Sequence, residues 1–172
     1  MKKKITAIIA IMMCVFTLGL SVSPAFAASP ASATATVSWS SFPTQARYSG
    51  NYTASYTYGI QVFLYYLYPG YRDTLGTLDG IYGSGTEKMV KQFQSGHNLT
   101  KTGETDSATW AKMQSLLVKL SLDDYPNTGE EDPNIVHYGV GTYRTTVFKY
   151  NISTGKWSVF VPSDNYGWKI MN

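Results

Sequence analysis

In three stretches, the chain carries apolar residues at the spacing of one helical face. In the first stretch they recur at i, i+3, i+4 and i+7: Ile60, Phe63, Leu64 and Leu67. That spacing predicts an amphipathic helix, and Pro69–Gly70 predicts its end. The second stretch has its apolar stripe at Met89, Val90 and Phe93. We expect Thr86 to cap this second helix and Gly96 to end it.

A third helix is predicted to begin after Asp106 or Ser107, because both residue types cap helices. Its apolar face is expected at every third or fourth position: Trp110, Met113, Leu117 and Leu120. The three apolar faces can close on one another. We therefore expect residues 50–120 to fold without the rest of the chain.

Towards the C-terminus the pattern changes to the two-residue period of β-strands. Tyr143–Tyr150 and Lys156–Val161 are predicted strands, joined by a turn at Asn151–Gly155. The residues expected on the buried face of this hairpin are Trp157, Val159 and Val161. A further strand is expected around Tyr166, Trp168 and Ile170. The predicted fold class is therefore α+β, with a three-helix domain followed by a small antiparallel hairpin or sheet.

The first residues predict export. Lys2–Lys4 precede an apolar run from Ile5 to Leu20, and Ala25 and Ala27 are small residues at the positions of a cleavage site. The run is short for a membrane span, and no stop-transfer pattern follows it. We therefore expect cleavage after Ala27.

Removal of this signal peptide changes what composition and charge imply. The chain holds 14 basic and 11 acidic residues, and three of the lysines lie in the signal peptide, so the mature chain carries no net charge. Such a chain, without a basic stripe, is not expected to bind nucleic acid. Cys14, the only cysteine, also lies in the signal peptide, which leaves no thiolate nucleophile and no disulfide.

Composition and pattern together divide the chain into five segments. They are a signal peptide (1–27), a flexible or extended segment (28–57), a helical domain (58–120), an acidic linker (121–134) and a β-rich region (135–172).

Residues 79–86 read DGIYGSGT and predict a rigid turn ahead of the second helix. Gly80 and Gly83 are expected to take turn conformations that are closed to residues with a side chain. Asp79 is expected to accept hydrogen bonds from the backbone amides that follow it. The side chains expected to plug the core from this turn are Ile81 and Tyr82.

The order of these parts resembles the peptidoglycan-binding domain family of bacterial cell-wall hydrolases. The sequence pattern of that family is D-G-hydrophobic-aromatic-G, T, V, F-Q, G/N-L, G, T-W, in this order along the chain. Here it is carried by Asp79, Gly80, Gly83, Thr86, Val90, Phe93–Gln94, Leu99–Thr100, Gly103 and Thr109–Trp110. The resemblance covers about Tyr58 to Leu120, and Thr102–Met113 is similar to the variant found ahead of secreted metalloproteases. The first helix departs from the family, with Phe63–Leu64 where a Leu-Gln pair is usual.

The resemblance implies a wall ligand, either glycan or stem peptide, held by aromatic faces and a few polar groups. The ligand-binding candidates are Tyr71, Arg72, Tyr82 and Gln92 near the turn, and Tyr150, Tyr166 and Trp168 in the β-rich region. For Tyr82 a core position is favoured over ligand contact, and Phe93 and Trp110 are assigned to the core. The aromatics available as a sugar-stacking platform are Phe148, Tyr150, Trp157, Phe160, Tyr166 and Trp168. About two-thirds of them are expected in the core of the small sheet.

These features predict a secreted, cell-wall-associated protein that binds peptidoglycan without catalysis, cofactor or metal. The two histidines, His97 and His137, lack the spacing of a zinc peptidase, and His97 is expected to cap a helix end. The alternative is a small wall-lytic enzyme, or a remnant of one, with an acidic centre in residues 121–172. A glycosidase needs two carboxylates, and the candidates there are Glu130, Glu131 and Asp132.

Overall fold

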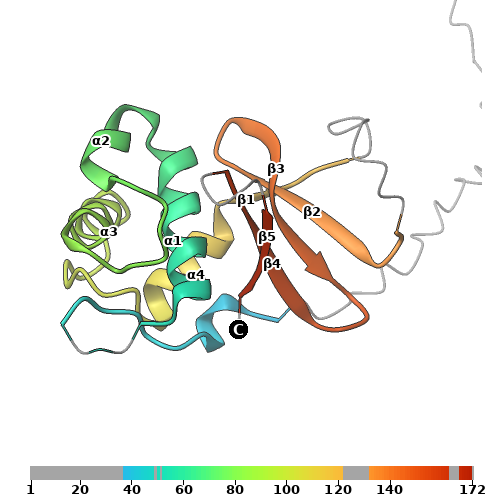
Figure 1. The fold of residues 1–172 in the computed structure, drawn as a ribbon, viewed down its shortest axis with the longest axis horizontal. Coiled ribbons are helices and arrows are strands. Elements are labelled where there is room, and N and C mark those ends of the chain that lie inside the picture. The colour runs from blue at the N-terminus through green and yellow to red at the C-terminus, as the bar shows by residue number, and fades with distance from the viewer. Residues whose placement is uncertain (1–36, 49, 51, 122–131, 163–166, 172) are drawn as a thin grey trace, which may run out of the picture. The chain divides into compact units, whose positions relative to one another are not determined.

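Helices occupy the first part of the described chain and strands the second, which confirms the predicted α+β class (Figure 1). The structure is a computed structural model that describes residues 37–48, 50, 52–121, 132–162 and 167–171, all within the unit Thr34–Asn172. The helical elements are η1 (Trp39–Ser41), α1 (Ala54–Leu67), η2 (Pro69–Tyr71), α2 (Arg72–Leu75), α3 (Ser84–Gly96) and α4 (Ser107–Ser115). The strands are β1 (Leu117–Lys119), β2 (Ile135–Val140), β3 (Tyr143–Asn151), β4 (Lys156–Val161) and β5 (Gly167–Met171). The predicted signal peptide, Tyr166, Glu130 and Glu131 lie outside the described residues.

The five strands form one antiparallel sheet in the order β1-β2-β3-β4-β5. β3 and β4 confirm the predicted hairpin, and its turn is held by Asn151, whose side-chain oxygen accepts the Thr154 N–H at 2.9 Å. The face predicted to be buried is buried: Trp157, Val159 and Val161. β5 confirms the further strand, whereas β1 and β2 were not predicted as strands.

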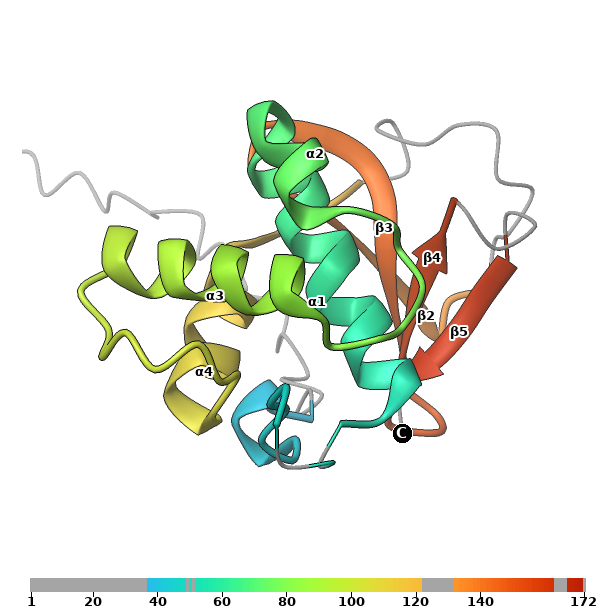
Figure 2. The same cartoon turned by 60° about the vertical axis from the view of Figure 1, so that its left-hand side comes forward.

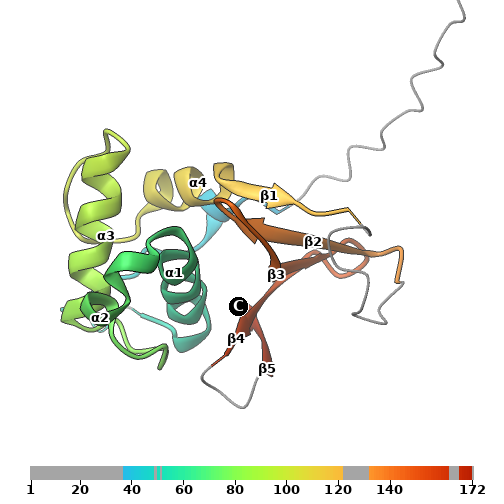
Figure 3. The same ribbon diagram turned by 90° about the horizontal axis from the view of Figure 1, so that it is seen from above.

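α1 is the central element of the fold. Residues 59–64 are all buried, and a helix with such a run is covered on every side. On one side Gly59 lets the sheet come close, since a Cβ there would lie 2.5 Å from the Met171 side chain. On the other side Phe63 meets Phe93 of α3 edge to face, with ring centroids 5.7 Å apart. Figure 3 shows α1 between α3 and strands β4 and β5.

The helices differ from the prediction at their ends. α1 ends at Leu67, ahead of Pro69, as predicted, but it begins at Ala54. The predicted flexible or extended segment over residues 28–57 therefore includes the first turn of a helix. Asp106 caps α4 as predicted, with its carboxylate accepting the Thr109 N–H at 2.8 Å.

The prediction that the third helix continues to Leu120 is wrong. α4 ends at Ser115, and Leu117 lies in β1, opposite Val140 of β2. The Leu120 N–H donates to the His137 carbonyl at 2.9 Å. Spacing that fits a helical face is here overridden by strand pairing, so the sheet begins inside the predicted helical domain.

Residues 37–45, which we call the N-terminal strap, tie the helices to the sheet. Several hydrogen bonds attach it. Among them, Trp110 Nε1 donates to Pro43 O at 3.1 Å, Trp157 Nε1 donates to Val37 O at 2.9 Å, and Gln114 Oε1 accepts the Trp39 N–H at 2.8 Å. The Trp39 side chain is fully buried in a cluster that includes residues of α1, α3, α4 and the sheet. One core therefore serves both parts of the chain, which argues against independent folding of residues 50–120. The strap is the blue segment in Figure 2.

Two buried glutamines hold the loops that precede α3 and α4. Gln61 Oε1 accepts the Gly80 N–H at 2.9 Å, and its Nε2 donates to the Ile81 carbonyl at 3.1 Å. Gln94 does the same with Gly103 and Glu104, at 2.9 and 2.8 Å. The Nε2 atoms also donate to further oxygens at matching positions: Asp79 and Thr86 for Gln61, Thr102 and Thr109 for Gln94.

The two loops are thus one structural unit used twice, 23 positions apart in the sequence. The helices they precede begin at Ser84 and Ser107, at the same offset. Gly80 and Gly103 both have positive φ, 74° and 82°, which favours glycine. In the first helix the buried glutamine that holds a loop is Gln61, two positions before the Phe63–Leu64 pair.

The turn at residues 79–86 agrees with the prediction at Asp79 and Gly80 and differs from it at Ile81, Gly83 and Thr86. Asp79 Oδ1 accepts the Ile81 N–H at 2.9 Å, as expected. Gly83 is the N-cap of α3 with φ −83°, so the special conformation predicted for it is wrong, and Thr86 lies inside the helix. Ile81 points to solvent instead of plugging the core. The glycine that lacks space is Gly85, where a Cβ would lie 2.4 Å from the Leu75 carbonyl oxygen.

Candidate functional site

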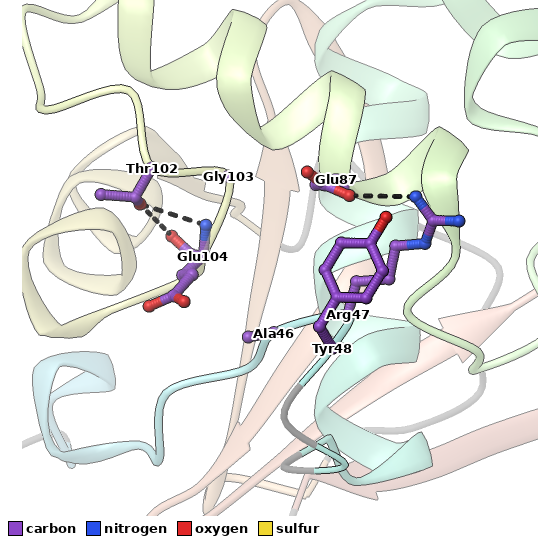
Figure 4. Close-up of a pocket in the computed structure, with 7 residues that line it drawn as sticks. All are labelled: Ala46, Arg47, Tyr48, Glu87, Thr102, Gly103 and Glu104. Carbon is purple, nitrogen blue, oxygen red and sulfur yellow. Dashed lines mark hydrogen bonds and ion pairs between the residues drawn. The ribbon is translucent and has the colours of Figure 1, made fainter.

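A pocket of about 290 Å³ lies where the chain after the strap meets α3 and the glutamine-held loop that precedes α4. Its lining residues come from three segments: Ala46, Arg47 and Tyr48; Glu87; and Thr102, Gly103 and Glu104. Figure 4 shows Arg47, Tyr48 and Glu87 on one side and residues 102–104 on the other. We call it the Arg47 pocket.

Backbone pairing brings the two sides of the pocket together. Gln45 and Thr105 exchange N–H···O bonds of 3.2 and 2.9 Å, which form an isolated antiparallel bridge. Arg47 and Tyr48 follow that bridge directly, and Glu104 precedes it. The pocket therefore depends on a contact between residues 60 positions apart in the sequence.

Glu87 is the charged centre of the pocket. Its carboxylate accepts hydrogen bonds from Lys91 Nζ at 2.5 Å and from Arg47 Nη1 at 3.3 Å. The bond from Lys91 is the main cause that holds the pKa of Glu87 below its ordinary value, and Arg47 adds to it. Gly103 lies close to the same group, because a Cβ there would be 2.6 Å from Lys91 and 3.0 Å from Glu87.

The pocket also offers an aromatic face and a second carboxylate. Tyr48 is 81% exposed, and the Arg47 guanidinium carbon lies 4.7 Å from its ring centroid. Glu104 is exposed at the other side of the pocket. Both signs of charge and an aromatic ring in one concave surface suit a ligand that carries carboxylate and amine groups together.

Tyr71 and Arg72, two of the predicted ligand-binding residues, lie on η2 and α2 and do not line the Arg47 pocket. The Arg72 guanidinium carbon lies 3.9 Å from the Tyr65 ring centroid, and its Nε donates to the Tyr65 carbonyl at 3.4 Å. Arg72 therefore packs on α1. Tyr71 is exposed and has its ring edge against Tyr68.

Two other predicted tyrosines are core residues. Tyr82 is buried, and its hydroxyl donates to the Gly103 carbonyl at 2.8 Å, which fits the core position favoured for it. Burial raises the pKa of this hydroxyl well above its ordinary value. Tyr150 was expected to remain exposed, but it is buried and its hydroxyl accepts the Val37 N–H at 3.1 Å. It thus anchors the strap.

The remaining candidates lie elsewhere on the surface. Gln92 lines a shallow groove on α3 whose cationic residues are Lys88, Lys91 and Lys101. Trp168 lies on the outer face of the sheet, apart from both. Phe93 and Trp110 are in the core as predicted, and His97 Nδ1 lies 2.9 Å from the Phe93 carbonyl at the end of α3.

The comparisons with known proteins concern the helical part of the chain. Residues 60–113 match the family model described as a putative peptidoglycan binding domain, which confirms the predicted resemblance. Comparison of the chain with curated proteins and with solved structures gives no match. The matched segment supplies Glu87 and residues 102–104 of the Arg47 pocket.

The same match supports peptidoglycan as the partner and the wall as the place of action. In the described part of the chain, no helix combines the length and the apolar character that crossing a membrane requires. Arg47 and Tyr48 lie outside the matched segment. Sequence reasoning missed them because their pattern carries no signal, and only the Gln45–Thr105 bridge places them beside Glu87.

Proposed function

We propose that this protein is exported and binds peptidoglycan without cleaving it, with the Arg47 pocket in contact with the peptide stems. The observation that carries the proposal is the position of the pocket. The family-matched segment supplies Glu87 and residues 102–104 of its lining, and the segment after the strap supplies Arg47 and Tyr48.

The chemistry of the pocket fits a stem peptide. Such peptides present free carboxylates and amines, which suit the guanidinium of Arg47 and the carboxylates of Glu87 and Glu104 respectively. Arg47 is paired with Glu87 in the ligand-free protein, so a ligand carboxylate must share or replace that bond. Affinity is therefore expected to be weak and to fall with added salt.

Export is supported by the basic, apolar and small-residue pattern of residues 1–27. Absence of catalysis is supported by the lack of a cysteine after Ala27 and of a zinc-peptidase histidine spacing in the sequence. We therefore expect non-covalent binding to peptidoglycan to be what retains the exported protein at the wall.

The test is sedimentation of residues 28–172 with purified insoluble peptidoglycan, together with a turbidity assay. We expect the protein to sediment, the turbidity to stay constant, and Arg47→Ala to weaken retention about five- to tenfold. Lys119→Ala removes an exposed charge outside the pocket and is the control. Loss of turbidity would refute the non-catalytic assignment.

Arg72→Ala separates the pocket from the site predicted by sequence alone. A drop in retention with Arg72→Ala and none with Arg47→Ala would place the ligand at α2 and refute the pocket.

A further inference from the structure

The shallow groove on α3 that Gln92 lines is a second concave surface in the helical part of the chain. Its volume is about 500 Å³. Its lining residues come from α3 and from the loop after that helix: Lys88, Lys91, Gln92, Ser95, Gly96 and Lys101. None of them also lines the Arg47 pocket. We call this surface the Lys88 groove.

Helix geometry places the polar groups of α3 in one row. They stand at i, i+3, i+4 and i+7, which is one face of a helix: Lys88, Lys91, Gln92 and Ser95. The row is about 10 Å long, since each residue advances a helix by about 1.5 Å. The buried residues of α3 lie on the opposite face: Thr86, Met89, Val90, Phe93 and Gln94. A ligand can therefore occupy the groove without disturbing the core.

The groove carries positive charge that the protein itself does not neutralise. Lys91 donates to Glu87, so its charge is paired. Lys88 and Lys101 are exposed, and in the described part of the chain neither side chain forms an ion pair or a hydrogen bond. No described residue of the lining is acidic. Two ammonium groups are therefore available to an anionic ligand.

The type of cation favours phosphate as the anion. Lysine binds phosphate as a point charge with three donors, whereas the planar fork of arginine matches the two oxygens of a carboxylate. The cations of the Lys88 groove are all lysines, in contrast to the Arg47 pocket. Gln92 and Ser95 add a side-chain amide and a hydroxyl, which can hydrogen-bond to neutral hydroxyl groups of a ligand.

The shape and the side chains of the groove indicate the rest of the ligand. A row about 10 Å long is longer than one phosphate group, so it can follow a chain of them. No described lining residue is aromatic. Single-stranded nucleic acids bind on aromatic rings against which their bases stack, and the groove offers none. Short polyol linkers between the phosphates need only hydrogen-bonding partners.

We propose that the Lys88 groove binds a phosphodiester polymer of small polyols, with phosphates at Lys88 and Lys101 and linker hydroxyls at Gln92 and Ser95. The inference goes beyond the proposed function, because it concerns another face of α3 and a ligand other than peptidoglycan. The bond from Lys91 of the groove to Glu87 of the Arg47 pocket joins the two surfaces. A wall that carries both ligands would be held at two weak sites, which raises retention above that of either site.

The test is a nuclear magnetic resonance titration of ¹⁵N-labelled residues 28–172 with three soluble probes. They are a glycerol-phosphate hexamer, hexaglutamate as the carboxylate counterpart, and a thymidylate hexamer as the nucleic-acid counterpart. We expect the glycerol-phosphate hexamer to bind about fivefold more tightly than either counterpart, with amide shifts at Lys88, Gln92, Ser95 and Lys101. Equal or tighter binding of a counterpart, shifts confined to other residues, or no binding of any probe would overturn the proposal.

Variants separate the groove from the net charge of the protein. Lys88→Gln combined with Lys101→Gln should weaken binding of the glycerol-phosphate hexamer about tenfold. Lys91 stays in place because it holds Glu87. The matched control is Lys112→Gln combined with Lys119→Gln, which removes the same charge outside the groove. Thermal melting shows that each variant is folded, and an equal loss of affinity in the two folded double variants would refute the site.

The outcome is separable from that of the proposed function. Peptidoglycan stripped of phosphodiester polymers tests the Arg47 pocket alone, and the glycerol-phosphate hexamer tests the groove alone. If the protein does not sediment with stripped peptidoglycan but binds the hexamer through Lys88 and Lys101, the groove stands and the proposed function falls. If it sediments with stripped peptidoglycan and does not bind the hexamer, the proposed function stands and the groove falls.

Discussion

Replacement of Trp39 by alanine tests whether the helices and the sheet unfold as one unit. Trp39 is fully buried and meets five aromatic rings at centroid distances of 5.1 to 6.4 Å: Phe42, Phe63, Trp110, Phe148 and Trp157. These rings come from the strap, α1, α4, β3 and β4. The cavity left by the indole would therefore open at the junction of every layer.

The expected cost follows from that burial. Truncation of a buried Trp or Phe to Ala costs about 3–5 kcal/mol, and a domain of this size has about 5–15 kcal/mol of stability in all. Trp39→Phe is the matched variant. It loses part of the ring contacts, but it also removes an indole Nε1 that is buried without a hydrogen-bond partner among the described residues. Removal of this unpaired N–H offsets about 1–3 kcal/mol of the lost packing energy. Trp39→Phe should therefore lower the free energy of unfolding by less than about 2 kcal/mol.

The assay is urea unfolding of residues 28–172, followed by far-ultraviolet circular dichroism so that the loss of a tryptophan does not alter the signal. We expect a single transition whose midpoint falls strongly for Trp39→Ala and little for Trp39→Phe. A loss below about 1 kcal/mol for Trp39→Ala would contradict the shared core. Separate transitions for helix and sheet signals would contradict it as well.

Three further predictions concern the loops. Gly85→Ala should destabilise by about 1–3 kcal/mol because its Cβ would meet the Leu75 carbonyl oxygen at 2.4 Å, whereas Gly83→Ala should change stability by less than about 1 kcal/mol; equal melting temperatures would refute this. Gln94→Leu should cost about 1–3 kcal/mol by leaving the buried Gly103 N–H unpaired, and Gln92→Leu, on the surface, should not, as urea titration would show. Burial raises the pKa of Tyr82 above its ordinary 10.0, so the folded state favours the neutral hydroxyl. Stability should therefore be maintained below pH 10 and fall by about 1.4 kcal/mol per pH unit above it, less so in Tyr82→Phe.

Elements with a strong local period could be predicted from the sequence. The stripe of Met89, Val90 and Phe93 identified α3, and the alternation of Trp157 and Val159 identified β4. Leu117 and Leu120 also fitted a helical face, but their backbone groups pair with β2, a partner that local spacing cannot show. Tertiary contact decided that segment.

The same limit applies to the candidate site. Trp39 stands alone in a segment without periodicity, so its place in the core was not foreseeable from spacing. Arg47 and Tyr48 acquire a partner only when Gln45 bridges to Thr105. Conversely, Tyr150 was predicted at a binding surface because the sequence does not show that Val37 returns to meet its hydroxyl.

The paired glutamines have a consequence for how the surface of the two loops can change over evolution. Gln61 and Gln94 grip the loops by a backbone amide and a backbone carbonyl, so the side chain at the gripped carbonyl is free to vary. Ile81 and Glu104 occupy that equivalent position, and both are exposed, one apolar and one acidic. The two loops differ in that side chain while keeping the same pair of backbone hydrogen bonds. Positions 81 and 104 are therefore where new ligand specificity can be selected, or engineered, on an unchanged scaffold.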